Sequence, residues 1–278
     1  MILGIDIGGT NIAIGKLKNN LLIEKVLKPT PYDKGLKESI AIFIEMIAPF
    51  ICSKTKGIGI GVPSVVDTSK GIVYNVANIP SWEEVHLKDI LEEKFNIPVK
   101  LNNDANCFVS GLKSFGEAKD YNNIIGITLG TGVGAGVIIN GKLYEGVNTS
   151  AGEIGEMPYL DSIFEHYCAS MFFSNNNNIT GKEAFKLAQQ GDKNALKLWE
   201  EFGFHLGKLV RTVLLAYDPE IIVFGGSITD AYSFFEEGML RSLDDFPFPK
   251  SLEQLIIKLS KNPDIAILGA AALVNNLK

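Results

Sequence analysis

Short apolar runs rich in β-branched residues alternate along this chain with longer segments whose apolar residues recur at helical spacing. The short runs predict strands on both sides of the glycines at 8–9 and 130–134, and also at residues 21–27, 57–62, 99–101, 136–144 and 220–224. The longer segments predict helices at residues 35–50, 87–95, 105–115, 182–190, 195–217 and 268–277. Loops are predicted at residues 64–81 and at the asparagine-rich residues 174–178. Because strands and helices alternate, we expect an α/β fold.

Glycine-containing turns follow three of the predicted strands, at Gly8-Gly9, Gly130–Gly132 and Gly225-Gly226. Residues 124–135 can be laid over residues 2–13, with Ile2 on Ile124, Gly8 on Gly130 and Ala13 on Ala135 among the coincidences. The shared plan predicts two related halves, each presenting a glycine turn to a common cleft. Backbone N–H groups at such turns suit phosphate oxygens, and bare glycine backbone lets an adenosine lie close.

Asp6 is the one charged residue in the apolar N-terminal run. A carboxylate on a buried strand is costly unless it meets a cation or a hydrogen-bond donor. One interpretation is a phosphate turn in which Asp6 faces a metal–nucleotide complex; the other is an ordinary hairpin in which Asp6 bonds its own turn. The overlay of the two halves places Asp6 on Thr128, so only the first turn offers a carboxylate to a metal.

Further carboxylates stand at positions with two interpretations. Asp104, between a predicted strand and a predicted helix, is either a helix cap or a general base that accepts a proton from a substrate hydroxyl. Glu153 and Glu156 are three residues apart and share a face if the segment is helical, and Glu165 follows soon after. Carboxylates are acceptor-only, which suits a neutral polyol with many O–H donors. The alternative for the pair is a solvated acidic face.

Composition and charge exclude several classes of function. With a net charge of −6 and a pI near 5.2, the chain lacks the excess of positive charge that binds nucleic acid, and an acidic surface binds anionic lipid poorly. The three cysteines contain no CxxC pair, so we expect reduced thiols and no zinc site or disulfide framework. The three histidines form no ligand pattern. With no signal peptide and no apolar stretch long enough for a membrane helix, we expect a cytoplasmic protein with no membrane partner.

The residues Gly130-x-Gly132-x-x-Ala135 match a dinucleotide-binding motif, but the residues that follow exclude a dinucleotide-binding fold. That motif needs a helix after its glycines. Here an apolar run, the turn Asn140-Gly141 and a second short run follow, which predicts a hairpin instead.

Six motifs, in order along nearly the whole chain, resemble those of the ROK family (repressors, open reading frames, kinases). They are Asp6-Ile7-Gly8-Gly9-Thr10, Gly61-Val62-Pro63, Asn102-Asn103-Asp104-Ala105-Asn106, Leu129-Gly130-Thr131-Gly132-Val133-Gly134, Gly152-Glu153-Ile154-Gly155 and Gly225-Gly226. The resemblance implies the actin/hexokinase-like fold, with two ribonuclease-H-like domains around a central cleft. We expect a small N-terminal domain at residues 1–104, completed by a C-terminal helix at 265–278, and a large domain at 105–264.

The resemblance also implies ATP-dependent, Mg²⁺-dependent phosphorylation of a hexose or N-acetylhexosamine, with a homodimer as a possible assembly. Asp104 matches the family's catalytic base. The positions that match sugar contacts are Asn78, Asn103, Glu153 and Glu165. Those that match nucleotide contacts are Asp6, Gly8, Gly9 and Thr10 in the first phosphate turn, Thr131 and Gly132 in the second, and Gly225 and Gly226 at the adenosine. Asp6 is expected to serve the metal through the nucleotide.

Four departures from the family pattern bear on these expectations. Many members carry a cysteine-rich zinc loop before the position of Glu165; residues 159–164 fill that space here without cysteine, so we expect no zinc. Glu156 stands where a histidine that contacts the sugar is usual, and Ser64 stands where glycine backbone comes near the sugar. Asn11 stands where a lysine near the phosphates is usual. The alternative function is a non-catalytic, sugar-sensing regulator, and we expect no N-terminal DNA-binding module because the chain opens at the first turn.

Overall fold

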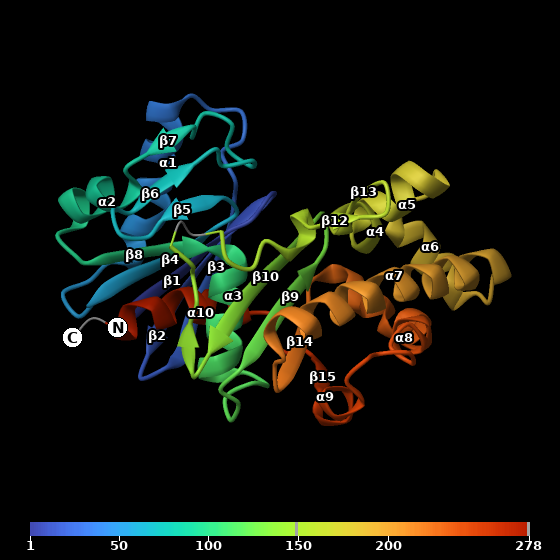
Figure 1. Cartoon of the computed structure of the whole chain (residues 1–278). Coiled ribbons are helices and arrows are strands. Elements are labelled where there is room, and N and C mark those ends of the chain that lie inside the picture. The colour runs from blue at the N-terminus through green and yellow to red at the C-terminus, as the bar shows by residue number, and fades with distance from the viewer. Residues whose placement is uncertain (148–149, 277–278) are drawn as a thin grey trace.

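Two five-stranded sheets with the same strand order form the framework of the chain (Figure 1). The computed structural model describes residues 1–147 and 150–276. The first sheet runs β3 (Leu21–Pro29), β2 (Asn11–Lys18), β1 (Ile2–Ile7), β4 (Gly57–Val62) and β8 (Val99–Asn103). The second runs β11 (Lys142–Leu143), β10 (Val133–Ile139), β9 (Ile124–Leu129), β14 (Ile221–Gly225) and β15 (Ile256–Leu259). In each, three antiparallel strands are followed by two parallel ones.

The register of the strands matches the two halves residue by residue. Asp6 pairs with Ala13 on one side and Gly61 on the other, and Thr128 pairs with Gly134 and Gly225. The prediction of two related halves is therefore confirmed. The overlay of Ala13 on Ala135 is wrong by one position, because the last pair of the first hairpin is Ile7 with Ile12, whereas that of the second is Leu129 with Val133, one residue closer along the chain.

The first sheet is covered by α1 (Leu36–Ile47), α2 (Leu87–Phe95) and a small sheet of β5 (Val65–Asp67), β6 (Ile72–Tyr74) and β7 (Glu84–Val85). Trp82 is fully buried there, stacked edge-on against Phe43 at 5.7 Å, and its indole N–H donates to Ser39 Oγ at 2.9 Å. The prediction of a plain loop at residues 64–81 is wrong, because β5 and β6 pair with each other within this segment and β6 also pairs with β7.

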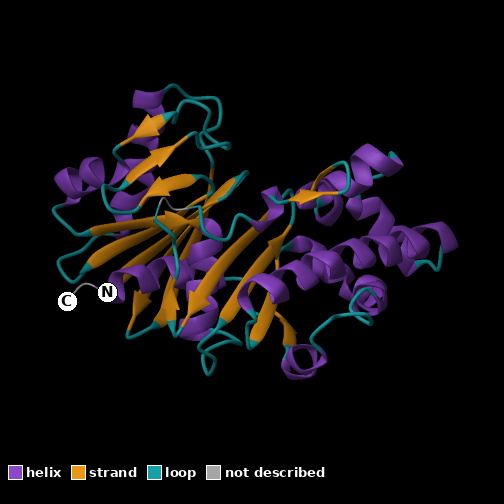
Figure 2. Cartoon of the chain, in the orientation of Figure 1, coloured by secondary structure: helices purple, strands orange, loops and turns teal. Residues whose placement is uncertain are grey.

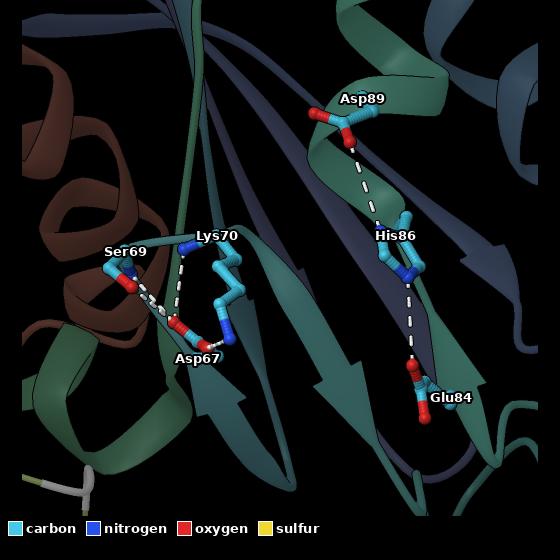
Figure 3. Close-up of polar contacts among 6 residues, drawn as sticks. All are labelled: Asp67, Ser69, Lys70, Glu84, His86 and Asp89. Carbon is cyan, nitrogen blue, oxygen red and sulfur yellow. Dashed lines mark hydrogen bonds and ion pairs between the residues drawn. The ribbon is translucent and has the colours of Figure 1, made fainter.

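Polar clusters on the small sheet stabilise its turn and its edge (Figure 3). Asp67 accepts hydrogen bonds from the Ser69 N–H (3.1 Å), the Ser69 hydroxyl (2.6 Å) and the Lys70 N–H (3.0 Å). These bonds lower the pKa of Asp67 to about 2. His86 lies between the carboxylates of Glu84 (3.6 Å) and Asp89 (3.9 Å) on the exposed surface. Both clusters are solvated surface contacts.

Two helices pack against each other between the sheets: α3 (Asp104–Phe115), which lies on β9 and β10, and α10 (Ile265–Ala272), which lies on β1 and β4 (Figure 1). The approach is close because a Cβ at Gly4, Gly59 or Gly269 would collide with backbone carbonyl groups. The predicted C-terminal helix begins earlier than expected and continues as a 3₁₀ turn over Leu273–Asn276. Residues 277 and 278 lie outside the described part of the chain.

Helices dominate the outer side of the second sheet (Figure 2). They are α4 (Phe164–Cys168), α5 (Ser170–Asn177), α6 (Gly181–Gln189), α7 (Lys193–Tyr217), α8 (Tyr232–Arg241) and α9 (Pro249–Gln254), with 3₁₀ turns at Ile154–Glu156 and Ser227–Ala231. A further 3₁₀ turn, Ala48–Phe50, follows α1 in the first half. The prediction of a loop at residues 174–178 is wrong: buried Phe172 and Phe173 anchor α5, and Asn178 ends it in the left-handed conformation (φ 50°). No helix within the described ranges has the length and apolar character needed to cross a membrane.

Candidate active site

A cavity of about 510 Å³ opens where β1 and β14 end and α3 begins. Two carboxylates from different elements, those of Asp6 and Asp104, line it together with the glycine backbone at 225–226. The rest of the lining is Phe108, Thr128, Thr229, Asp230, Ser260, Lys261, Asn262, Pro263, Ile265 and Ala266. The carboxyl ends of parallel strands are the usual place for a ligand in an open α/β sheet. The cavity therefore joins the predicted base, the predicted metal carboxylate and the predicted adenosine turn.

Asp6 is held in an environment that disfavours its charged form. Its pKa is raised to about 6, first by burial and then by the nearby charge of Asp104, while Lys25 opposes the shift. The first turn is closed by backbone, since the Gly8 N–H donates to Asn11 O at 3.0 Å. This backbone bond closes the turn without the Asp6 carboxylate, and the cation-facing role of Asp6 stays a prediction.

Asp104 is the first residue of α3, and the helix cap is its neighbour. Asn103 Oδ1 accepts from the Ala105 N–H at 2.9 Å, and Asp104 Oδ1 accepts from the same group at 2.8 Å. Burial raises the pKa of Asp104, although the hydrogen bond from Ala105 opposes the shift. Because Asn103 serves as the cap, the Asp104 carboxylate retains an oxygen for other chemistry.

The first glycine turn lies beside one of the predicted sugar contacts. A Cβ on Gly9 would come 3.4 Å from Asn78 Oδ1. Thr10 and Asn11 are exposed, and the Thr30 hydroxyl fixes the turn by donating to Gly8 O at 2.8 Å.

The second glycine turn is braced by residues of α4 and α5. Ser170 donates through its backbone N–H to Gly130 O (2.9 Å) and through its hydroxyl to Thr131 O (3.1 Å). Glu165 Oε2 accepts from the Val133 N–H at 2.9 Å, and a Cβ on Gly132 would collide with that carboxylate. Glu165, predicted as a sugar contact, therefore also supports the backbone of the turn.

The predicted acidic positions gather around Asp104. Glu153 precedes the 3₁₀ turn Ile154–Glu156, and three-residue spacing in a 3₁₀ turn aligns Glu153 with Glu156. The surrounding protein raises the pKa of Glu153, first by desolvation and then through the charges of Asp104, Glu156 and Glu165. A cluster of acceptor-only groups that repel one another suits a neutral ligand rich in hydroxyl donors.

Two further predicted sugar contacts adjoin each other. Asn103 Nδ2 donates to the backbone carbonyl of Ser64 at 3.2 Å, which ties the end of β8 to the segment that follows β4. Of the predicted residues, Asp6, Asp104, Gly225 and Gly226 line the cavity itself. The others are distributed around it on the two glycine turns, on the acidic cluster and on this pair.

Residues 159–164, where a zinc loop is common in the family that the motifs resemble, form a short hairpin. It consists of β12 (Pro158–Tyr159) and β13 (Ser162–Ile163). Tyr159 stacks on Phe164 at 4.3 Å, and its hydroxyl is 3.0 Å from His205 Nδ1 on α7. Across residues 1–147 and 150–276, no group of three or more histidine, cysteine or acidic side chains is arranged to hold a metal ion. Aromatic packing joins this hairpin to α7.

Sequence reasoning missed part of the cavity wall. Thr229 and Asp230 follow the adenosine turn, and Lys261 and Asn262 follow β15. The signal was present in the apolar run Ile256–Leu259, which is followed by polar residues and Pro263. Had that run been identified as a fifth strand, its carboxyl end would have been expected beside Gly225.

Comparisons with known proteins agree with the geometry. The ROK family profile matches residues 2–277. The glucokinase of Thermotoga maritima is 28% identical over 98% of this chain and 96% of its own length. The xylose repressor of Bacillus spizizenii is 31% identical over 84% of this chain and 66% of its own length. A solved ROK family glucokinase from Streptomyces griseus, in complex with glucose and AMPPNP, superimposes with a TM-score of 0.82 at 24% identity over 98% of both chains.

The structural match confirms the expected α/β fold of the actin/hexokinase type. In this chain, the framework of that fold is the two five-stranded sheets described above, with their repeated strand order. The sequence relatives include both a sugar kinase and a sugar-linked repressor. Because the family profile extends over nearly the whole chain, this protein belongs to the ROK family.

Proposed function

We propose that this protein is a sugar kinase that transfers the γ-phosphoryl group of ATP to a hydroxyl of a hexose or N-acetylhexosamine. The observation that carries the proposal is the meeting of Asp6 and Asp104 at one cavity, beside the glycine backbone at 225–226. The likeness to the Thermotoga glucokinase, and to a solved glucokinase that holds glucose and AMPPNP, supports the same activity.

Asp104 acts as the general base. Its carboxylate accepts the proton of the attacking sugar hydroxyl, a role usually worth about 10²–10⁴ in rate. Burial raises the pKa of Asp104, which makes the carboxylate a better proton acceptor than an exposed aspartate. Its neighbour Asn103 and the residues Ser64, Asn78, Glu153, Glu156 and Glu165 hold the sugar.

The ligand set fits a magnesium ion bound with the nucleotide. Mg²⁺ prefers oxygen ligands and is commonly held by one or two carboxylates together with substrate phosphates. Asp6 meets that need, since desolvation and the neighbouring Asp104 make its charge costly unless a cation is present. When bound, the metal would neutralise charge that develops on the phosphates.

The glycine turns bind the nucleotide. Gly8, Gly9, Thr10 and Asn11 form one phosphate turn, Thr131 and Gly132 the other, and Gly225 and Gly226 lie against the adenosine. The cavity at Asp6 and Asp104 is lined by three acidic residues, the third being Asp230. Lys261 adds a positive charge to its wall. Catalysis in such a site is largely positioning and electrostatic stabilisation.

The two sheets are the cores of two domains that close on the substrates. Residues 1–104, completed by residues 265–278, form the small domain, and residues 105–264 form the large one. The packing of α10 on the first sheet and of α3 on the second supports this division. Closure would exclude water and so limit wasteful hydrolysis of ATP.

A panel assay tests the proposal. ADP release is measured with MgATP and each of glucose, mannose, N-acetylglucosamine and N-acetylmannosamine. We expect at least one sugar to stimulate release well above the rate without sugar. If none does at millimolar concentration, the kinase proposal is wrong.

The match to a xylose repressor favours one second candidate, a sugar-sensing regulator without turnover. As such a regulator, this chain would bind a sugar, as seen by calorimetry or a shift in melting temperature, yet release no ADP. Sugar-stimulated ADP release that disappears in Asp104→Asn excludes it.

A further inference from the structure

Two residues before the proposed base lies a buried amide that no role above uses. Asn102, in β8, is only 4% exposed, and Asn106, in the first turn of α3, is 3% exposed. Buried amides are usually hydrogen-bonded, because an unpaired polar atom costs free energy. Asn106 Oδ1 is an exception, with no partner among the described residues. Asn102 finds partners for both ends of its side chain.

The carbonyl oxygen of this amide holds the start of α3. Asn102 Oδ1 accepts from the Asn103 backbone N–H at 2.8 Å and from Asn106 Nδ2 at 3.0 Å. The first bond fixes the peptide between Asn102 and Asn103, one residue before Asp104, and the second ties the first helical turn to the strand end. The position of the Asp104 carboxylate is thus set from both sides along the chain.

The nitrogen of the same amide reaches the other half of the molecule. Asn102 Nδ2 donates to Glu145 Oε1 at 2.5 Å. Asn102 belongs to the first sheet, whereas Glu145 follows β11 at the edge of the second, on the segment that leads to Glu153. A hydrogen bond to a carboxylate is stronger than one between neutral groups.

We propose that Asn102 and Glu145 are positioning residues, which join the two halves beneath the cleft and hold Asp104 at the attacking sugar hydroxyl. This inference rests on the proposed kinase function. An asparagine suits the position because it offers an acceptor to Asn103 and Asn106 and a donor to Glu145 at once. A leucine would lose all three bonds, and an aspartate would oppose its charge to that of Glu145.

The surroundings leave room for substitutions at both positions. Asn102 and Glu145 line a cavity of about 640 Å³, together with Ser110 and Lys113 of α3. A side chain of similar size at either position therefore need not displace packed neighbours.

A swap of the pair tests the proposal. In Asn102→Asp two carboxylates face each other, and in the double variant Asn102→Asp with Glu145→Gln the direction of the hydrogen bond is reversed. We expect kcat to fall about 10- to 100-fold in Asn102→Asp and Asn102→Leu, because small displacements of a reacting group are costly, while the KM for sugar changes less than about threefold. The double variant should recover to within about threefold of the wild-type kcat.

Amide hydrogen exchange over residues 102–106, without ligands, is a readout independent of turnover. We expect exchange about tenfold faster in Asn102→Asp and a return to the wild-type rate in the double variant. Glu93→Gln, at an exposed position on α2, is the matched control and should change neither readout. Single variants with wild-type kcat, or a double variant as impaired as Asn102→Asp, would overturn the inference while leaving the kinase proposal intact. Absence of sugar-stimulated ADP release in the wild type would overturn the kinase proposal instead.

Discussion

The turn between β1 and β2 and the turn between β9 and β10 stand at the same place in two sheets of the same order, yet their chemistry differs. The first carries Asp6, whose pKa is raised to about 6 by burial and by Asp104. The second carries Thr128, whose hydroxyl donates within its own hairpin to Gly134 O at 3.3 Å. The same framework thus holds a buried carboxylate whose charged form is disfavoured in one half and a hydrogen-bonded neutral hydroxyl in the other.

The difference teaches how a repeated framework divides one task. In the proposed kinase, backbone N–H donors of both turns bind the phosphates, and a metal carboxylate is needed from only one turn. A second carboxylate at Thr128 would add repulsion to a cavity that already holds Asp6, Asp104 and Asp230. The predictions below test this division of roles, from the largest expected effect to the smallest.

The largest effect is expected at the base that both halves serve. Asp104→Asn should lower kcat by about 10²–10⁴, because the amide cannot accept the sugar proton. Sugar affinity, measured by calorimetry, should change only a few-fold. Asp33→Asn, at an exposed position, is the matched control and should retain full activity. Turnover within tenfold of wild type in Asp104→Asn would remove Asp104 as the base.

The glycines of the nucleotide cavity and of the second turn should differ sharply when changed to alanine. Gly226 has φ 89°, and a Cβ there would collide with Leu129 O, whereas Gly130 has open space around that position. Gly226→Ala should lower the free energy of unfolding by at least about 2 kcal/mol, while Gly130→Ala should cost under about 1 kcal/mol. Urea denaturation measures both, and equal costs would contradict the geometry.

Asp6→Asn should weaken activity and strengthen the fold. The pKa of Asp6 rises from 3.8 to about 6 on folding, so the folded protein binds its proton more tightly than the unfolded chain. The penalty for ionised Asp6 is complete above pH 6 and vanishes as pH falls toward 4. Without nucleotide, Asp6→Asn should therefore raise the free energy of unfolding by about 1–3 kcal/mol at pH 7.5 and by little at pH 4. Urea titrations at the two pH values check this, and a gain equal at both would count against Asp6 as its source.

The smallest effect is expected at the position that matches Asp6 in the second half. Thr128→Val keeps the shape and loses one long hydrogen bond to Gly134 O. This substitution should lower the free energy of unfolding by less than about 1 kcal/mol and change kcat less than about threefold. A tenfold loss of kcat would mean that the Thr128 hydroxyl acts on the nucleotide, and the two turns would then share more of the chemistry than the comparison allows.

Much of the framework was predictable because its signals are local. Apolar runs gave the paired strands on both sides of the first two glycine turns, and the overlay of the two halves paired Asp6 with Thr128, as the register confirms. Asp104 was found at a strand-to-helix junction that a short sequence window reveals. Its cap alternative was settled only by the structure, which gives the cap to Asn103.

What sequence reasoning missed depends on contacts between distant segments. The run Ile256–Leu259 is a strand because β14 offers it an edge, and α5 persists through asparagines because Phe172 and Phe173 are buried against α7. The hydrogen bond from Asn102 to Glu145 joins residues that lie on different sheets, and no spacing in the sequence connects them. Lys261 and Asn262 reached the cavity wall by the same kind of long-range placement.

The proposed kinase transfers a phosphoryl group from ATP to a sugar hydroxyl at the cavity of Asp6 and Asp104. The most direct test is ³¹P NMR of ATP mixed with the wild-type protein and the sugar that most stimulates ADP release, with Mg²⁺ and then with excess chelator. We expect one sugar phosphate to form per ADP with Mg²⁺, and neither product with chelator. ADP appearing with free phosphate and no sugar phosphate would contradict the proposed transfer.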